Sequence, residues 1–282
     1  MSARAVHERF MVPAAACLLV SVGAVLAGCM TRPPDERLHS TLWVQTSSEY
    51  AISTAQVYRM AIEQLDAAIR DPQWAALDYG DETAGAPPAI IIDVDDTVLD
   101  NSGHTARAIL SRQGFNRESW SAWVREASAP AVPGAVEYLQ HAAARDVTVI
   151  YLTNRHADYD AATRENLVAV GAPMRAGTDV LMSRRDEPGW TRDKTGRRRL
   201  AARRYRVLQV VGDDLADFIQ LPEGVNDEQR VELATARKDR WGREWFVLPN
   251  PIYGSWERAL MPGSGSIFTL PMEQKFRHLE TR

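Results

Sequence analysis

The feature that most constrains the fold is an apolar run that ends abruptly in acids. The chain reads Ile90-Ile91-Ile92-Asp93-Val94-Asp95-Asp96-Thr97, so three isoleucines are followed at once by clustered carboxylates. An uninterrupted apolar run of this kind is typical of a strand buried on both faces of a parallel sheet. Ligands of open parallel sheets bind just beyond the carboxyl ends of the strands. Because crowded carboxylates repel one another, the sequence predicts a cation at this edge of the sheet.

Two further apolar runs end in polar residues, each of a different kind. Residues 147–152 lead into Thr153-Asn154-Arg155, and residues 207–211 lead into Gly212-Asp213-Asp214. A shorter run covers 245–248, and helical patterns separate the runs at 134–144, 158–170 and 197–204. Strands that alternate with helices imply right-handed βαβ units and a parallel sheet. The sequence therefore predicts a doubly wound α/β fold.

Two segments outside this alternation are predicted to build a small cap. The first lies in 42–80, where apolar side chains recur at helical spacing over 47–70 and Ser47 or Ser48 caps the helix. The second is an insertion at 101–130 that follows the first strand. Because it follows a strand end, the insertion is expected to lie over the carboxyl edge of the sheet.

Residues 1–28 are predicted to be a secretory signal rather than part of the fold. Arg4 and Arg9 precede an uncharged stretch that ends in small residues. The segment Leu26-Ala27-Gly28-Cys29 resembles a bacterial lipobox, which implies cleavage before Cys29 and attachment of diacylglycerol to it. The alternative is an uncleaved transmembrane anchor, since nineteen uncharged residues could just span a bilayer. Either interpretation exports the rest of the chain.

Composition limits the chemistry of the exported part. The chain has two cysteines, Cys17 and Cys29, so cleavage leaves one, which excludes an internal disulfide and a catalytic thiol. A formal net charge of −4 argues against a nucleic-acid partner. Residues 29–41, with Pro33-Pro34, are predicted to tether a single domain at 42–282 to the membrane.

The strand ends, taken in order, resemble the motifs of the haloacid dehalogenase superfamily of phosphotransferases. Residues 93–97 resemble its first motif, Thr153 its second, Lys194 its third and residues 212–217 its fourth. The segments 42–50, 131–135, 211–218 and 249–257 resemble the class C acid phosphatases, bacterial lipoproteins of the four-aspartate group in that superfamily. The resemblance covers roughly 42–260. It implies a haloacid-dehalogenase-like doubly wound parallel sheet with a small helical cap.

The chemistry of phosphoryl transfer suits these residue types. Asp93 is predicted to attack phosphorus, because a carboxylate is a competent nucleophile that can form an aspartyl-phosphate. Asp95 is predicted to protonate the leaving alcohol and then to activate water. Thr153 and Lys194 are predicted to stabilise the phosphoryl oxygens. Arg197 is the alternative to Lys194 as the cation that faces the phosphate.

The expected cofactor is Mg2+, which prefers carboxylate and water oxygens and bridges readily to phosphate. Its predicted ligands are Asp93, the backbone carbonyl of Asp95, and Asp213. Asp217, and as an alternative Asp214, completes the shell directly or through water. The family usually has asparagine at the position of Asp214, so the charge of that residue sets this chain apart.

Aromatic and polar residues near the motifs are predicted to contact the substrate. They are Trp120, Trp123, Asn154, Arg155 and Tyr253. The alternative for the aromatic side chains is that they pack in the core, as most aromatic residues do. Taken together, one or two of them are expected to stack on a flat leaving group such as a nucleoside base.

The sequence thus predicts a lipid-anchored, Mg2+-dependent acid phosphatase of the bacterial cell envelope. Small phosphorylated metabolites, including nucleoside monophosphates, are its expected partners, and the outer membrane its expected location. A narrow 5′-nucleotidase, a phosphotransferase of the same superfamily and an inactive nucleotide-binding lipoprotein are the alternatives. The sequence leaves the oligomeric state and the natural substrate open.

Overall fold

The computed structural model describes residues 35–78, 85–175, 178–187, 189–260 and 272–280. The part from Glu36 to Arg282 forms one compact unit. The predicted signal and Cys29 lie outside the described residues, so the structure leaves both as predictions. Within the described ranges, no helix combines the length and the apolar character needed to cross a bilayer.

A single five-stranded sheet organises this unit, and all of its neighbouring strands are parallel. Its order is β3-β2-β1-β4-β5. The strands are β1 Pro88–Ile92, β2 Thr148–His156, β3 Leu181–Arg184, β4 Arg206–Gly212 and β5 Trp245–Val247. The predicted doubly wound α/β fold is confirmed. Four of these strands were predicted from the sequence, whereas β3, the edge strand beside β2, was not.

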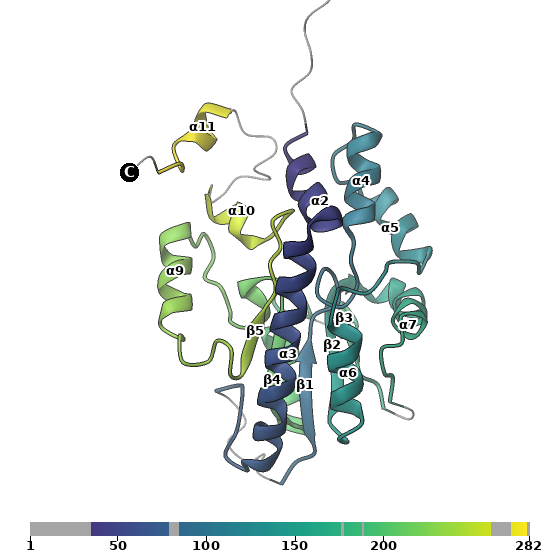
Figure 1. Ribbon diagram of the computed structural model, residues 1–282, viewed down its shortest axis with the longest axis vertical. Coiled ribbons are helices and arrows are strands. Elements are labelled where there is room, and N and C mark those ends of the chain that lie inside the picture. The colour runs from purple at the N-terminus through teal and green to yellow at the C-terminus, as the bar shows by residue number, and fades with distance from the viewer. Residues whose placement is uncertain (1–34, 79–84, 176–177, 188, 261–271, 281–282) are drawn as a thin grey trace, which may run out of the picture. The chain divides into compact units, whose positions relative to one another are not determined.

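Side chains that alternate along β1 enter two separate cores, one on each face of the sheet. Ile90 and Ile92 pack with helices α3 (Ser48–Arg70), α6 (Ala135–Ala143) and α7 (Asp160–Ala169). Ala89 and Ile91 pack on the opposite face, against α8 (Thr195–Arg204). Figure 1 shows α3 and α6 crossing the near face of the sheet. This double covering explains why the strands are apolar throughout.

The long helix α3 supports the loop that follows β1. It begins as predicted, because the Ser47 side chain accepts a hydrogen bond from the backbone N–H of Tyr50. The Tyr58 hydroxyl donates to the backbone carbonyl of Thr97 at 2.6 Å. Gly134, at φ +90°, lets α6 start close to α3, where a Cβ atom would lie 3.1 Å from the Ala55 backbone. The acidic loop is therefore attached to a rigid helix.

The cap is helical, as predicted, but of the segment 42–80 only the end of α2 (Arg37–Thr46) belongs to it, because α3 packs on the face of the sheet instead. The cap consists of α2, which packs on α4 (Ser102–Leu110), and of α5 (Arg117–Arg125), which packs on α4 in turn. These helices lie beyond the carboxyl edge of the sheet (Figure 1). Residues 37–41, assigned from the sequence to the tether, form the first turns of α2, so the tether is shorter than predicted.

Shorter helices complete the described chain. They are the 3-10 turns Ala157–Tyr159 and Leu215–Asp217, and α9 Asp227–Thr235, α10 Ser255–Leu260 and α11 Met272–Phe276. The turn Leu215–Asp217 and the start of α10 matter for function, because both carry residues that hold the acidic loops in place.

Candidate active site

Four elements bring the predicted motifs to one place at the carboxyl edge of the sheet. Asp93 follows β1, and Asp213 follows the neighbouring strand β4. Lys194 is the residue that immediately precedes α8. Asp217 lies at the end of the 3-10 turn after β4. Residues more than a hundred positions apart in sequence thus share one site.

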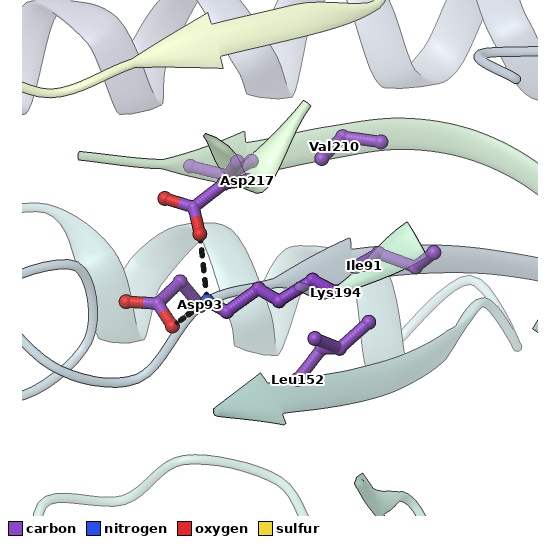
Figure 2. A pocket seen from close by; sticks show the side chains of 7 residues that line it. Ile91, Asp93, Leu152, Lys194, Val210 and Asp217 are labelled. Atoms are coloured by element: carbon purple, nitrogen blue, oxygen red, sulfur yellow. Dashed lines mark hydrogen bonds and ion pairs between the residues drawn. The ribbon is translucent and has the colours of Figure 1, made fainter. Parts of the chain in front are cut away.

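Lys194 is buried between two of these carboxylates. Its Nζ donates to Asp93 Oδ1 and, at 2.6 Å, to Asp217 Oδ1. Its aliphatic stem lies beside Ile91, Leu152 and Val210, as Figure 2 shows. Lys194 is 4% exposed and Asp93 7% exposed. Burial lowers the pKa of Lys194, but Asp217 and Asp93 outweigh burial and raise it, so the ammonium group stays charged.

Three carboxylates meet beside this ammonium group and fit a divalent cation. One oxygen from each of Asp93, Asp213 and Asp217 lies within 4.8 Å of the others. Three negative charges against the single charge of Lys194 leave an excess that a divalent cation would neutralise. Burial raises the pKa of Asp93 to about 7, with Lys194 opposing this rise and Asp217 and Asp95 adding to it. Burial and the carboxylates of Asp217 and Asp93 also raise the pKa of Asp213 well above its usual value. An all-oxygen donor set of this kind suits Mg2+.

The aspartates of the turn after β4 face in different directions. Asp217 faces the cluster, and its Oδ2 also accepts the backbone N–H of Asp214 at 3.0 Å. A Cβ atom at Gly212 would overlap the Asp217 carboxylate, so glycine is needed there. Asp214 turns away and accepts hydrogen bonds from Ser255 N, Ser255 Oγ and Ala216 N. Of the two residues left as alternatives by the sequence, the structure places Asp217 in the cluster.

Asp95 is held by two neighbours through one of its oxygens. Asp95 Oδ1 pairs with Arg155 through Nε at 2.9 Å and Nη2 at 2.8 Å, and it accepts Asn101 Nδ2 at 2.9 Å. The Thr153 hydroxyl lies 3.5 Å from the other oxygen, Oδ2, and accepts the backbone N–H of Arg155. One oxygen of Asp95 is therefore fixed by cationic and amide donors, and the other carries only one long contact.

A C-terminal segment, residues 250–255, binds both acidic turns and is called the clamp below. Asn250 Nδ2 donates to Asp213 at 2.7 Å, and the Tyr253 hydroxyl donates to Asp96 at 2.5 Å. Ser255 binds Asp214 through its backbone N–H and its hydroxyl. The clamp thus connects the turn after β1 to the turn after β4.

Thr97 adds a direct link between the two turns. Its hydroxyl lies 3.3 Å from Asp213 Oδ1 and 3.5 Å from Asp93 Oδ2. The sequence analysis gave no role to Thr97, Asn101, Asn250 or Ser255. The resemblance at 249–257 was a signal for the last two, but it did not say which acids they contact.

The positive charge nearest Asp93 comes from Lys194 rather than from its alternative, Arg197. The Arg197 guanidinium is fully buried and donates to the backbone carbonyls of Thr153 at 2.5 Å and Thr191 at 3.1 Å. It also donates to Asn154 Oδ1 at 2.8 Å. Burial lowers the pKa of Arg197 to about 10. Arg197 therefore fastens the end of β2 to α8.

The residues predicted to contact the substrate differ in how far they are exposed. Asn154 is exposed, and Tyr253 is 40% exposed although its hydroxyl is bound to Asp96. Trp120 is half-buried, with its ring 5.7 Å from the Arg155 guanidinium. Trp123 is buried and donates its indole N–H to Asn101 Oδ1 at 2.7 Å. Trp123 is thus a packed residue behind Asn101, which agrees with core packing, the alternative given for the aromatic residues, and not with substrate contact. Arg155 is 2% exposed and is committed to Asp95.

A buried aspartate paired with a lysine, beside two further aspartates at the carboxyl edge of a parallel sheet, defines a phosphoryl-transfer site of the haloacid dehalogenase kind. The model of the HAD superfamily, subfamily IIIB (acid phosphatase), matches residues 30–256. The chain belongs to this family.

Solved structures agree with this assignment, and the chain is also similar to two plant proteins. The class C acid phosphatase from Bacillus anthracis is 30% identical, with a TM-score of 0.75, over 88% of this chain and 98% of that one. The same enzyme with tungstate bound gives 30% identity and a TM-score of 0.74 over the same shares. Two stem glycoproteins of Glycine max, of 28 and 31 kDa, are 23% and 24% identical over 58% of this chain. The chain spans 58% of the length of these two relatives.

Proposed function

We propose that the protein hydrolyses phosphate monoesters through a phosphorylated Asp93. The observation that carries the proposal is the position of Asp93. It is buried at the strand end, Lys194 holds one of its oxygens, and Thr97 contacts the other. Lys194 offers positive charge where the phosphoryl oxygens would arrive.

The proposed reaction has two steps. In the first, a carboxylate oxygen of Asp93 bonds to phosphorus, the bond from phosphorus to the ester oxygen breaks, and Asp95 gives a proton to the leaving alkoxide. In the second, Asp95 takes a proton from water, the water oxygen bonds to phosphorus, and the bond from phosphorus to Asp93 breaks. Inorganic phosphate leaves and both aspartates return to their starting states.

The cofactor proposed for this site is Mg2+, held by Asp93, Asp213, Asp217 and the backbone carbonyl of Asp95. When bound, the ion would supply charge neutralisation to the phosphoryl oxygens. Asn250 and Thr97 keep Asp213 oriented toward the cluster. Tungstate, a tetrahedral oxyanion, is bound in a structure of the Bacillus anthracis enzyme, which supports an oxyanion as the group recognised.

The proton-transferring oxygen of Asp95 is assigned to Oδ2. Arg155 and Asn101 occupy Oδ1, which already accepts their hydrogen bonds and does not face a leaving group. Oδ2 has only the long contact from Thr153 and is left to serve the leaving group. In this proposal Arg155 positions Asp95 instead of binding substrate.

The leaving group is proposed to be flat in at least some substrates, nucleoside monophosphates included. Trp120 belongs to the cap and lies beside Arg155, the partner of Asp95, whereas Tyr253 belongs to the clamp and binds Asp96. Both residues are partly exposed. Base stacking on an aromatic ring contributes about 1–3 kcal/mol. A narrow 5′-nucleotidase or a phosphotransferase would share this site, so a panel of phosphate esters and acceptor alcohols separates these activities.

Attachment to the membrane through lipidated Cys29 is also proposed. Its support is the lipobox-like sequence and its resemblance to the lipoproteins of the class C group. Such an anchor places the enzyme in the bacterial cell envelope, and Met30 after the cysteine favours the outer membrane.

The test is release of phosphate from p-nitrophenyl phosphate and from nucleoside monophosphates, with Mg2+ or with a chelator. The proposal predicts Mg2+-dependent release by the wild type and its loss in Asp93→Asn. Asp239→Asn is the matched control, because Asp239 is an exposed aspartate on the surface. Activity that survives Asp93→Asn would show that the proposed nucleophile is wrong, and nucleotide binding without any turnover would support the inactive binding protein.

A further inference from the structure

The outer end of the cap carries exposed apolar side chains that the phosphatase chemistry does not use. Leu110, the last residue of α4, is 83% exposed, and Phe115, just before α5, is 68% exposed. Leu38, in the first turn of α2, is 39% exposed. We call residues 37–38 and 110–117 the cap tip.

Contacts between α2 and α4 bring these residues to one end of the cap. Arg37 Nη2 donates to the backbone carbonyl of Gln113 at 2.9 Å, so the start of α2 lies beside the end of α4. At the opposite end of the same pair, Gln45 Nε2 lies 3.2 Å from Ser102 Oγ. The two helices are therefore antiparallel, and Leu38 shares the cap tip with Leu110.

Basic side chains accompany the apolar ones. Between positions 107 and 118 the chain has three arginines, at 107, 112 and 117, and one glutamate, Glu118. Arg112 and Arg117 are exposed, whereas Arg107 is paired with Glu126 at 2.6 Å. An apolar tip with exposed arginines is the combination that anionic lipid surfaces attract.

The length of chain before α2 brings this end close to a bilayer. Glu36 lies seven positions after Cys29, and α2 begins at Arg37. Fully extended, such a segment spans at most about 25 Å. A lipid on Cys29 would therefore hold the start of α2, and the cap tip beside it, within that distance of the headgroups.

We infer that the cap tip docks on the anionic lipid surface to which the chain is anchored, with Leu110 and Phe115 entering the headgroup region. The inference rests on the proposed lipidation of Cys29. A short tether keeps the tip at a high effective concentration near the surface, so contacts too weak to bind a free protein suffice. Docking then fixes the orientation of the catalytic unit, whereas an anchor alone leaves it free to tumble.

The chain offers a clean way to test this docking. Lipidation consumes the thiol of Cys29, and the other cysteine, Cys17, lies in the predicted signal, so an introduced cysteine is the single labelling site. Leu110→Cys carries an environment-sensitive fluorophore to the cap tip. Val168→Cys is the matched control, because Val168 is 59% exposed near the end of α7, a helix that runs from the carboxyl edge of the sheet toward the amino edge.

The lipidated full-length mature protein is bound to vesicles of phosphatidylcholine and phosphatidylglycerol. Docking predicts that the Leu110 probe shifts to the blue and loses most of its quenching by aqueous iodide, while the Val168 probe keeps both properties. A rise in salt, or vesicles of phosphatidylcholine alone, should weaken the Leu110 response.

Three results would overturn the inference, and they differ from one another. Vesicle-bound protein with both probes in water refutes docking but leaves the anchor intact. Protein that does not float with vesicles refutes the anchor, and the docking that rests on it. A Leu110 shift in lipid-free Cys29→Ser protein that grows with protein concentration shows that a second copy of the chain covers the tip. Loss of phosphatase activity would concern the proposed function alone.

Discussion

The turns that follow β1 and β4 each contain several aspartates, but the pKa of one aspartate is raised in the first turn and that of another is lowered in the second. Each turn directs some carboxylates into the cluster and binds another to the clamp: Asp96 after β1 and Asp214 after β4. Asp96 accepts one backbone N–H, from Asn101, and the Tyr253 hydroxyl. Asp214 accepts two backbone N–H groups and one hydroxyl.

The difference shows that burial alone does not decide the charge of a carboxylate. Burial raises the pKa of Asp96 to about 7, and the hydrogen bonds from Tyr253 and Asn101 offset only part of this rise. Burial would also raise the pKa of Asp214, but the hydrogen bonds from Ser255 and Ala216 outweigh it and hold that pKa below its usual value. Three short hydrogen bonds thus keep the pKa of the buried Asp214 low, whereas two hydrogen bonds do not offset the effect of burial on Asp96.

The largest effect on activity is expected from a substitution in the turn after β4, where two adjacent aspartates should respond differently. Asp213→Asn removes a carboxylate from the cluster and should lower kcat/KM by about 100-fold or more. Asp214→Asn introduces the residue that the family usually has there, and an asparagine oxygen can still accept two of the three hydrogen bonds. Its kcat/KM should stay within about threefold of the wild type, with a loss of about 1 kcal/mol in the free energy of unfolding. Steady-state kinetics and urea unfolding of both variants check this, and equal losses of activity would refute the division of tasks.

A somewhat smaller effect is expected at Asp95 in the first turn. Arg155→Lys retains the charge but lacks the planar guanidinium whose Nε–H donates to Asp95 Oδ1 at 2.9 Å. We expect kcat/KM on alkyl phosphates, which reports only the first step, to fall by about 10–100-fold, because the leaving groups of these esters need a proton. The fall on p-nitrophenyl phosphate should be smaller, because nitrophenolate leaves without one.

Arg145→Lys, a change at an arginine paired with Asp66 on the surface, is the control for this experiment. An equal fall for both classes of ester would mean that Arg155 acts on the phosphoryl group or on folding instead of on Asp95.

Substitutions of Tyr253 in the clamp should have modest effects that separate its hydrogen bond to Asp96 from the contact of its ring with the leaving group. Tyr253→Phe removes the hydrogen bond to Asp96 and keeps the ring, so the free energy of unfolding should fall by about 1–2 kcal/mol while KM for nucleoside monophosphates stays unchanged. Tyr253→Ala removes the ring as well and should raise that KM. If Phe and Ala raise KM equally, the ring does not contact the leaving group.

The smallest effects are expected in the pH dependence of stability, with opposite signs for the two turns. The folded pKa of Asp96 is raised, so its contribution is full below its unfolded pKa and is lost as the pH rises through about 7. The folded pKa of Asp214 is lowered, so its contribution is present above its unfolded pKa and is lost as the pH falls below it.

Urea unfolding at several pH values, in saturating Mg2+, measures both trends. Asp96→Asn should gain about 1 kcal/mol relative to the wild type between pH 5 and pH 8. Asp214→Asn should flatten the acid limb below about pH 4. The same trend in both variants would contradict the comparison of the two turns.

Much of the fold could be predicted because it has local signals. The isoleucines of β1 and the apolar runs of β2 and β4 mark buried strands, and Ser47 marks the start of α3. The strand β3 was missed because it has only four residues, and Ser183 and Arg184 interrupt its apolar pattern. The start of α2 was missed because the two prolines just before it suggested a flexible tether.

The site was predictable where a motif lies next to a strand end, and not where a contact spans the chain. The position of Lys194 beside Asp93 agrees with the prediction, whereas the roles of the site residues remain predictions until they are assayed. The bond from Asn250 to Asp213 and that from Tyr253 to Asp96 join residues 37 and 157 positions apart. No local pattern in the sequence specifies such pairs, and the commitment of Arg155 to Asp95 depends equally on the folded geometry.

The most direct test of the central claim is to trap the enzyme during turnover. The wild type, supplied with Mg2+ and a phosphate ester, is quenched in acid, and its peptides are analysed by mass spectrometry after borohydride reduction of acyl phosphates. The account predicts modification at Asp93 in the wild type and in Asp214→Asn, and none in Asp93→Asn. Modification of another residue in place of Asp93, or phosphatase activity retained by Asp93→Asn, would contradict nucleophilic catalysis by Asp93.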